Sequence, residues 1–522
     1  MIALLHHSVD DGAERAPERD AFRCDGEALT YAELSQKSSQ LAAVLRERGV
    51  RRGDRVAIYM TKSLQLPVAV YGVLKAGAAY VPIDPAAPRE RIETILRDCG
   101  IRHLITGESR ARKATRLQAE ARELQTVVGA SGEASVTWDE VFAASALTAA
   151  VHATSLDLAY VMYTSGSTGA PKGLMHTHDS GLAYARLSAR EYGVGPEDRL
   201  GNHSPLHFDM STFEFLTAPL AGATTVLVPE EAMLFPRRVA ELIEVERLTF
   251  WYSVPLALIQ LLDRGSLEHR DHSSLRWVLF GGEPFPPKHL ARLARHWPQV
   301  RFSNSYGPAE VNQCTAHHLS ASEIDGERPV PLGEIWPGAD GRIVDEHGED
   351  VADGASGELL ISAPTMMRGY WGRPDLNAVS FVEVELHPGF TRRYYRTGDL
   401  VRRSPDGLLE FLGRRDRQVK VRGYRVELDE LEALLCAEDG VAEAAAVALP
   451  SGGGDASLVA AALPETGGEI DGTVLRRRLA ERLPGYAVPS RVEVMDALPR
   501  TGSDKIDRPA LARQLAATSP SK

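Results

Sequence analysis

Residues able to hold phosphate groups are concentrated in one segment, Tyr163–Gly173, which reads YTSGSTGAPKG. Gly166 and Gly169 let the backbone approach a ligand closely, and Lys172 adds a positive charge for phosphate oxygens. The segment is not a Walker A loop, because that pattern needs a glycine where Pro171 stands. Taken alone, it is also compatible with a Ser/Gly-rich surface turn. The hydroxyl donors are Thr164, Ser165, Ser167 and Thr168.

The elements that must position this segment read as alternating strands and helices. Leu158–Tyr163 is apolar and bounded by polar residues, which predicts a buried strand leading into the segment. Strands separated by helix-sized segments predict a layered α/β fold. The polar stretch Gly107–Ser135 reads as a surface excursion. Further strands are expected at Arg55–Tyr59, Thr224–Val228, Trp277–Phe280, Leu408–Leu412 and Gln418–Val421, and helices at Leu34–Arg48, Val68–Lys75 and after Leu428.

Motifs across nearly the whole chain resemble, in order and spacing, those of the acyl-adenylate-forming superfamily, which includes nonribosomal-peptide adenylation domains, acyl-CoA synthetases and luciferases. The resemblance implies a large layered N-terminal adenylation domain over residues 1–415 and a smaller, mobile α+β C-terminal domain over residues 416–522. The motifs are LTYAEL (29–34), KAGAAYVPIDP (75–85), YTSGSTGAPKG (163–173), GGEP (281–284), NSYGPAE (304–310), YYRTGDL (394–400), GRRDRQVKVRGYRVE (413–427) and PRTGSDKIDRPAL (499–511).

The resemblance implies an ATP site. Tyr306 would offer its ring to the adenine base, Asp399 would accept hydrogen bonds from the ribose, and Glu310 would supply an oxygen ligand to Mg²⁺. The family usually has threonine at the position of Ala309, so one hydroxyl contact to the α-phosphate is missing. The ATP-binding residues implied are Thr164, Ser165, Gly166, Ser167, Thr168, Gly169, Lys172, Gly282, Glu283, Pro284, Ser305, Tyr306, Gly307, Asp399, Arg414 and Lys505.

The C-terminal motifs imply a catalytic cation and a hinge. Lys505 would bind the substrate carboxylate and the α-phosphate, stabilising the charge that develops between them. Thr164 and Lys172 would take part in catalysis from the phosphate loop. Asp416 would be the hinge about which the small domain rotates between two half-reactions. The family commonly has Asn-Gly before the lysine, where this chain has Ser503-Asp504.

The motif HFDMSTFEF (207–215) indicates an amino-acid substrate. Asp209 corresponds to the aspartate that pairs with the α-ammonium group in amino-acid-activating members. A buried carboxylate without a cation is costly, so an acid without an amine would bind poorly. The alternative is that Asp209 is a helix N-cap. The lining residues implied are Asp209, Met210, Phe213, Tyr252, Leu279, Gly281, Ser305, Gln313, Cys314 and Lys505.

The pocket composition indicates a small substrate. Phe213, Tyr252 and Leu279 would fill space and favour a compact apolar group. Stand-alone prolyl-carrier-protein ligases look similar, although Gly281, Ser305 and Gln313 depart from their pattern. Proline is therefore the first expectation, and alanine, serine, glycine and a small β-amino acid stay open.

The reaction implied has two halves: ATP-dependent formation of an aminoacyl-adenylate, then transfer to the phosphopantetheine thiol of a separate carrier protein or of coenzyme A. One alternative is an acyl-CoA synthetase for a non-amino carboxylic acid. Another is a catalytically weak nucleotide-binding protein, which Ala309 and Ser503-Asp504 would favour.

Composition predicts a cytoplasmic protein without nucleic-acid or membrane partners. The net charge of −12 over 522 residues lacks the basic footprint of a nucleic-acid binder. Four scattered cysteines indicate a reducing compartment. The N-terminus lacks the pattern of a secretory signal, and Leu66–Pro85 contains a lysine and prolines that make it a poor membrane span.

Overall fold

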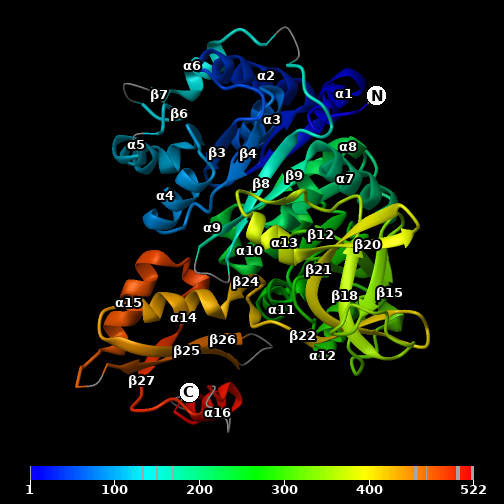
Figure 1. The fold of residues 1–522 in the computed structure, drawn as a ribbon. Helices are drawn as coiled ribbons and strands as arrows, with labels where there is room; N and C mark the ends of the chain where they lie inside the picture. The colour runs from blue at the N-terminus through cyan, green and yellow to red at the C-terminus, as the bar shows by residue number, and fades with distance from the viewer. Residues whose placement is uncertain are drawn as a thin grey trace. The chain divides into compact units, whose positions relative to one another are not determined.

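The computed structural model describes residues 2–121, 123–131, 135–147, 151–166, 170–451, 456–465, 467–500 and 506–518. The chain forms two compact units, and the long C-terminal stretch of the smaller one begins at Asp416 (Figure 1). The larger unit contains residues 1–85, 96–163 and 173–415, and the smaller unit contains residues 86–95, 164–172 and 416–522.

A nine-stranded sheet spans the larger unit. It is parallel from β14 through β1 and has antiparallel neighbours at both edges. Parallel sheets bring the carboxyl ends of their strands to one edge, which is where ligands bind in α/β folds. In spatial order the strands are β16 (Glu334–Ile335), β15 (Thr315–Ser320), β14 (Arg301–Tyr306), β13 (Trp277–Gly281), β12 (Phe250–Ser253), β10 (Arg199–Asn202), β11 (Thr224–Leu227), β1 (Asp20–Cys24) and β2 (Glu27–Thr30).

An eight-stranded sheet carries the strand that leads into the phosphate-loop segment. That strand, β8, pairs in parallel with β4, and the sheet is parallel onward from there through β3, β5, β6 and β7. In spatial order the strands are β19 (Gly369–Tyr370), β9 (Lys172–Thr177), β8 (Leu158–Thr164), β4 (Ala79–Pro82), β3 (Arg55–Tyr59), β5 (His103–Thr106), β6 (Thr126–Val128) and β7 (Ser135–Val136).

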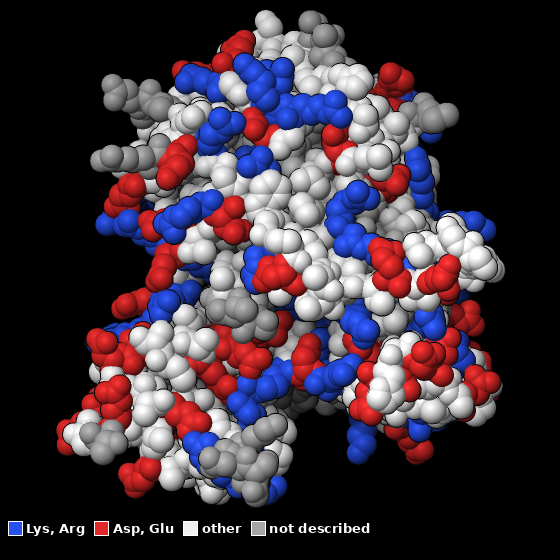
Figure 2. All heavy atoms as spheres, viewed as in Figure 1, with Lys and Arg blue, Asp and Glu red and all other residues white. Residues whose placement is uncertain are grey.

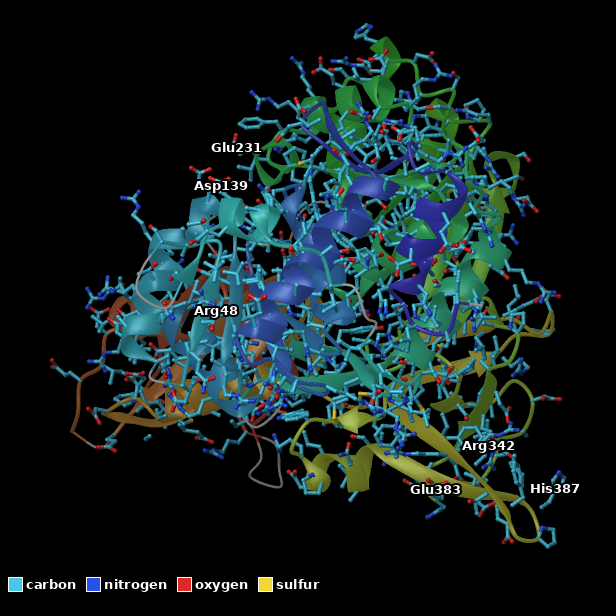
Figure 3. All side chains as sticks on the ribbon, turned by 90° about the horizontal axis from the view of Figure 1, so that it is seen from above. Arg48, Asp139, Glu231, Arg342, Glu383 and His387 are labelled. Atoms are coloured by element: carbon cyan, nitrogen blue, oxygen red, sulfur yellow. The ribbon has the colours of Figure 1, made fainter. Side chains whose placement is uncertain are left out.

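A third sheet, antiparallel throughout, completes the larger unit. On its edge strand β20, exposed residues alternate with half-buried ones, and the exposed Glu383 and His387 point away from the ribbon in Figure 3. Arg342 on β17 donates to Asp350 at 2.9 Å. The strands are β17 (Asp340–Val344), β18 (Ser356–Ser362), β21 (Phe390–Arg403), β20 (Phe381–His387) and β22 (Leu409–Arg414).

The helices connect and cover these strands. The 15-residue α7 shows how the sequence sets their ends: Thr177 caps its first turn through a capping box, and Gly193 ends it in the left-handed region, at φ 61°. The helices outside the C-terminal stretch are α1 (His7–Arg15), α2 (Tyr31–Glu47), α3 (Gln65–Lys75), α4 (Arg89–Asp98), α5 (Ala111–Glu120), α6 (Trp138–Ala143), α7 (His178–Tyr192), α8 (Ala218–Ala221), α9 (Glu230–Met233), α10 (Pro236–Val245), α11 (Pro255–Arg264), α12 (Pro287–His296) and α13 (Pro374–Ser380).

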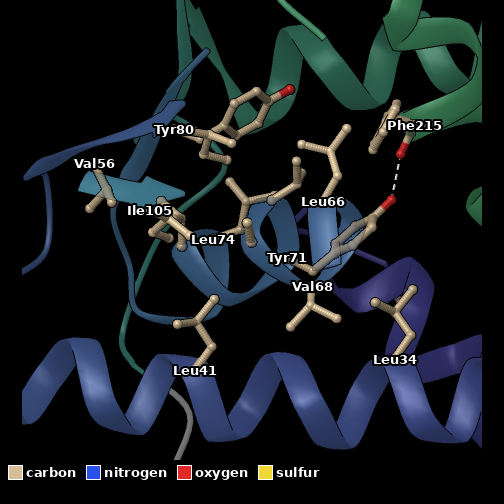
Figure 4. Packing of buried hydrophobic residues seen from close by; sticks show 14 of the residues in the cluster. Leu34, Leu41, Val56, Leu66, Val68, Tyr71, Leu74, Tyr80, Ile105 and Phe215 are labelled. Carbon is tan, nitrogen blue, oxygen red and sulfur yellow. Dashed lines mark hydrogen bonds between the residues drawn. The ribbon is translucent and has the colours of Figure 1, made fainter. Parts of the chain in front are cut away.

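The packing of α2 on α3 is a well-defined part of the core (Figure 4). Leu41 of α2 lies so near Gly72 of α3 that a Cβ on the glycine would come within 2.6 Å of the leucine side chain. Glycine is therefore needed for the two helices to approach. Tyr71 is fully buried and donates its hydroxyl hydrogen to the carbonyl oxygen of Phe215, which satisfies a polar group inside the apolar core.

The smaller unit has its own apolar core. Leu428, Leu431, Leu434 and Leu435 are buried on one face of α14, as the sequence predicts, and pack against strands β25 and β26. The C-terminal elements are β23 (Gln418–Val421), β24 (Tyr424–Glu427), α14 (Leu428–Cys436), β25 (Val441–Pro450), β26 (Ala456–Pro464), α15 (Gly472–Arg482), β27 (Arg491–Val494) and α16 (Arg508–Ala517).

The predicted α/β class, with a large N-terminal part and a smaller C-terminal part, is confirmed, and each strand and helix expected from the sequence is present within a few residues. The interpretation of Gly107–Ser135 as a surface excursion is wrong in part. β6 is buried and extends the eight-stranded sheet beside β5, and Leu117 of α5 is buried as well. The apolar residues of the segment 107–135 are few and widely spaced among charged ones, so the sequence shows no clear strand or helix periodicity there.

The charge distribution, the cysteines and the helix lengths can be compared with the expectations from composition. Acidic and basic side chains are intermixed on the face shown in Figure 2. All four cysteines are free thiols; three are buried and Cys436 is exposed. Among the described residues, no helix combines the length and the apolar character that crossing a membrane requires.

Candidate active site

Three of the residues predicted to bind ATP meet in the larger unit. The Tyr306 hydroxyl donates to Oδ2 of Asp399, and Arg414 Nη1 donates to Oδ1 at 2.6 Å. The ion pair follows from strand register, because Asp399 of β21 lies opposite Arg414 of β22. Asp399 is 5% exposed. The result is a carboxylate held in place by a cation and a hydroxyl, suited to accept hydrogen bonds from the hydroxyls of a sugar.

Glu310, the predicted metal ligand, is fully buried. Its Oε1 accepts a hydrogen bond from the Tyr370 hydroxyl at 2.7 Å. Burial lowers the pKa of the nearby His176 to about 4, so this imidazole is neutral near pH 7 and adds no positive charge. No group of three or more metal-binding side chains occurs among the described residues. One carboxylate fits a Mg²⁺ ion that arrives with a nucleotide, since Mg²⁺ uses few protein ligands beside substrate phosphates.

Asp209 begins the short helix η2 (Asp209–Ser211) and is not its N-cap, which is Phe208. Its Oδ1 accepts a hydrogen bond from the backbone N–H of Met210 at 3.0 Å. The carboxylate lies near two buried tyrosines. Burial raises the pKa of Tyr252, and the neighbouring Tyr192 and Asp209 raise it further. Burial also raises the pKa of Tyr160, with a smaller contribution from Asp209. Tyr160 is a neighbour that the motifs do not indicate.

Four of the predicted pocket residues share one buried cluster: Met210, Phe213, Tyr252 and Leu279. Tyr252 and Leu279 are direct partners on the parallel strands β12 and β13. The Phe213 ring meets the Tyr252 ring edge to face, with 5.9 Å between centroids. These side chains come from four separate elements, and they form a buried apolar cluster that includes Met210, the residue after Asp209.

Glycines let the backbone close in around this cluster. A Cβ on Gly281 would come within 2.3 Å of the Ser305 carbonyl oxygen, across the β13–β14 pair. A Cβ on Gly307 would come within 2.1 Å of the backbone carbonyl oxygen of Asn312. Gly282, which opens the segment Gly282–Pro284 after β13, has φ 89° and so occupies a conformation that favours glycine.

Cys314 belongs to a different apolar cluster from Met210, Phe213, Tyr252 and Leu279. It is fully buried beside Val311 and Leu332, and its Sγ lies 3.7 Å from the Tyr306 carbonyl oxygen. Burial raises the pKa of the thiol, so it is protonated. The structure therefore places Cys314 next to the predicted adenine residue, Tyr306.

Part of the phosphate-loop segment belongs to the smaller unit. The Thr164 hydroxyl, at the end of β8, is buried with no hydrogen-bond partner in the described part of the chain. Ser165 Oγ donates to the Arg425 carbonyl oxygen at 2.8 Å, and Lys172 Nζ lies 3.9 Å from Glu427 Oε1. A Cβ on Gly166 would come within 2.1 Å of the Ala170 oxygen. Predicted residues Ser167, Thr168, Gly169 and Lys505, with Ser503-Asp504, lie outside the described residues.

The predicted hinge residue, Asp416, is the first residue of the long stretch of the smaller unit. Its Oδ1 accepts a hydrogen bond from the Gln418 N–H at 3.2 Å. The larger unit ends at Arg415 and the smaller unit resumes at Asp416. Rotation about Asp416 stays a prediction.

Glu214, in the helix η3 (Phe213–Thr217), gives a pH-dependent prediction for stability. It is 1% exposed and accepts from Asn202 Nδ2 at 3.0 Å. Burial raises its pKa from 4.5 to about 8, so the folded state keeps a proton that the unfolded chain releases. The stability contributed by the protonated carboxyl is present below pH 4.5 and is lost as the pH rises to about 8.

We therefore expect Glu214→Gln to be more stable than the wild type at pH 8, on the order of a few kcal/mol, and the difference to vanish near pH 4.5. Thermal unfolding across this range measures the difference, with Glu231→Gln, at an exposed position, as the control. An identical pH slope for Glu214→Gln and the wild type would show that Glu214 is ionised in the folded state.

Comparison with known protein families gives two matches. The model of the AMP-binding enzyme family matches residues 9–371, and that of the AMP-binding enzyme C-terminal domain matches residues 430–505.

Individual proteins are similar over almost the full length. An L-proline--[L-prolyl-carrier protein] ligase of Pseudomonas fluorescens is 35% identical over 98% of this chain and 100% of its own. The amide bond synthetase McbA of Marinactinospora thermotolerans superposes with a TM-score of 0.86 at 27% identity, over 98% of this chain and 99% of its own. The adenylation domain AlmE of Vibrio cholerae, in complex with glycyl-adenosine-5'-phosphate, has a TM-score of 0.84 at 28% identity, covering 99% and 98%.

Proposed function

This chain belongs to the family of AMP-binding enzymes, and we propose that it is an ATP-dependent ligase that activates a small amino acid and loads it onto a carrier protein. The product of the first half-reaction is an aminoacyl-AMP, and the acceptor in the second is the phosphopantetheine thiol of a separate carrier protein. The Pseudomonas relative is named as a ligase that joins proline to a carrier protein, and the similarity extends over its whole length.

The observation that carries the amino-acid assignment is the position of Asp209. Its carboxylate lies near the buried rings of Tyr160 and Tyr252, and the next residue, Met210, belongs to a buried apolar cluster. A carboxylate in such surroundings is stabilised by a cation. The α-ammonium group of an amino acid supplies that cation, whereas a simple carboxylic acid leaves Asp209 without it.

The first half-reaction is a substitution at phosphorus. An oxygen of the amino-acid carboxylate bonds to the α-phosphorus of ATP, and the bond from that phosphorus to the bridging oxygen of pyrophosphate breaks. Asp399 holds the ribose, Tyr306 lies along the base, and Lys505 neutralises charge at the α-phosphate and carboxylate. Thr164 and Lys172, with the rest of the loop, hold the outer phosphates. Glu310 would hold Mg²⁺, which would supply further charge neutralisation at the phosphates.

In the second half-reaction the carrier thiol attacks the carbonyl carbon of the adenylate, forming a thioester and releasing AMP. Rotation of the C-terminal domain about Asp416 brings a different surface of that domain to the adenylate for this second half-reaction. Because ATP is a substrate and all four cysteines are free thiols, we place the reaction in the cytoplasm.

Proline is the first candidate among small amino acids. Phe213, Tyr252 and Leu279 provide a compact apolar surface of the kind that suits a small ring, and the Pseudomonas relative is named for proline. Alanine, serine and glycine are the other candidates, since apolar pockets separate substrates by only about 1–3 kcal/mol per methylene.

The test is amino-acid-dependent exchange of radiolabelled pyrophosphate into ATP by the purified full chain, with each small amino acid and with the corresponding acid that lacks the amine. We expect exchange with one small amino acid, followed by loading of a phosphopantetheinylated carrier protein. Exchange only with the amine-free acids, and thioester formation on coenzyme A, would support an acyl-CoA synthetase instead. Nucleotide binding without any exchange would support a nucleotide-binding protein.

A further inference from the structure

A buried hydrogen-bond network adjoins the proposed amino-acid pocket and is centred on Tyr192, the last residue of α7. The Tyr192 hydroxyl lies 2.8 Å from Gln313 Nε2 and 3.0 Å from Ser305 Oγ. Its ring meets that of Phe213 edge to face, with 5.7 Å between centroids. Tyr192 thus contacts three of the residues assigned to the pocket, although no motif singles it out.

The far side of the network extends away from the pocket. The Tyr192 hydroxyl also lies 3.4 Å from Ser303 Oγ, which lies 3.0 Å from Nδ1 of His318. His318 Nε2 in turn lies 2.9 Å from a carboxylate oxygen of Glu191. Because a carboxylate can only accept, His318 Nε2 donates to Glu191. These contacts anchor Tyr192 from behind.

The orientation of the Gln313 amide is set by its neighbours. Besides Tyr192, its Nε2 lies 3.4 Å from the carbonyl oxygen of Thr315. A carbonyl oxygen can only accept, so the amide nitrogen must occupy this position. The two hydrogens of the amide are then directed to Thr315 and to Tyr192. Burial raises the pKa of Tyr192, so its hydroxyl keeps its own hydrogen and donates it to a serine.

The other polar atom of the Gln313 side chain, Oε1, can only accept a hydrogen bond. Gln313 is 2% exposed, and Oε1 has no hydrogen-bond partner among the described residues. Buried acceptors are nearly always paired, and an unpaired one costs free energy. The network therefore fixes an acceptor in place and leaves it unused.

We propose that Gln313 Oε1 accepts a hydrogen bond from the side chain of the amino-acid substrate, and that Tyr192 is the positioning residue that holds the amide in this orientation. The preferred substrate is then a small amino acid whose side chain bears an O–H or N–H group, such as a hydroxyl on a short chain or on a five-membered ring. The proposal rests on the proposed function, which assigns Gln313 to the pocket. Sites that hydrogen-bond a substrate hydroxyl discriminate strongly against the analogue without it.

The test compares matched substrates in the pyrophosphate exchange reaction. The pairs are L-serine with L-alanine, L-threonine with L-2-aminobutyrate, and each 4-hydroxy-L-proline diastereomer with L-proline. We expect kcat/KM for the hydroxyl-bearing member of the best pair to be higher by about tenfold or more. Gln313→Met, which keeps the length of the side chain without the acceptor, should reduce that ratio to about one.

Tyr192→Phe keeps the ring and removes the hydroxyl that orients the amide. We expect it to raise KM for the hydroxyl-bearing substrate several-fold more than KM for the apolar partner, so that the ratio of their kcat/KM values falls. The matched control is Tyr31→Phe, which also removes a buried hydroxyl, here one bonded to the Ala223 carbonyl oxygen at 2.7 Å. It should leave the substrate ratio as in the wild type.

The outcomes distinguish a failure of the role assigned to Gln313 from a failure of the proposed function. Exchange in which the apolar member of every pair is used as well or better overturns the role of Gln313 and leaves the proposed function in place. A hydroxyl preference that persists in Gln313→Met also overturns it. Exchange with no amino acid refutes the proposed function, and the substrate assignment fails with it. The kcat/KM ratios of the wild-type enzyme for the substrate pairs test the hydroxyl preference even where a variant does not fold.

Discussion

Lys505→Ala loses amino-acid-dependent pyrophosphate exchange by about 10²–10³-fold, the expected cost of removing a charge aimed at the transition state. Lys505 is the cation that the family resemblance assigns to the α-phosphate and the carboxylate, and it lies outside the described residues. Because substitution at phosphorus concentrates negative charge between these two groups, the loss should be found mainly in kcat.

The second half-reaction distinguishes a catalytic role from a structural one. Supplied with preformed aminoacyl-AMP, Lys505→Ala should still load the carrier protein at a rate near that of the wild type. Lys113→Ala, an exposed lysine on α5, is the control for removing a positive charge. Near-normal exchange by Lys505→Ala would refute the assignment, and equal loss of both half-reactions would indicate a folding defect.

Asp209→Asn is the second change for which we expect a large effect. It removes the negative charge but keeps an oxygen able to accept from the Met210 N–H, which in the wild type is 3.0 Å from Oδ1. Losing a charge-assisted pair near buried aromatic rings corresponds to about 3–4 kcal/mol. We therefore expect kcat/KM for the amino acid to fall by about 10²–10³-fold.

The informative quantity is a ratio between two substrates of the same shape. L-proline and cyclopentanecarboxylic acid differ by the ring nitrogen, so the wild type should strongly prefer proline and Asp209→Asn should not. Asp139→Asn, an exposed carboxylate on α6 that Figure 3 labels, should preserve the preference. If Asp209→Asn still discriminated fully between the two, the ammonium group would have to be bound elsewhere.

Sequence reasoning located the residues that sit in contiguous motifs. Asp399 and Arg414 belong to two motifs, and the antiparallel register of β21 and β22 joins them. Met210, Phe213, Tyr252 and Leu279 were identified individually, and tertiary packing gathers them into one cluster. Asp399, Arg414, Met210 and Phe213 lie within the motifs, whereas Tyr252 and Leu279 lie outside them on strands β12 and β13, and the fold brings these residues together.

Tyr160 and Tyr192 could not be predicted in the same way. Each lies in an ordinary context, a buried strand and the end of a helix, where a tyrosine is most simply a core residue. Their importance comes from neighbours far along the chain: Asp209 for Tyr160, and Gln313, 121 residues away, for Tyr192. Cys314, which the resemblance implies for the pocket, packs in a separate apolar cluster, and its place in the pocket stays a prediction.

The order of strands in the nine-stranded sheet bears on how the protein is made. β1 pairs in parallel with β11, so that Phe22 lies opposite Thr225, and a ribosome must add about 200 residues, taking roughly 10–40 s, before the partner strand exists. During that interval the nascent chain carries an apolar strand without its neighbour, a state prone to aggregation. Slow synthesis at low temperature, or added chaperones, should therefore raise the yield of native enzyme more than a stronger promoter does.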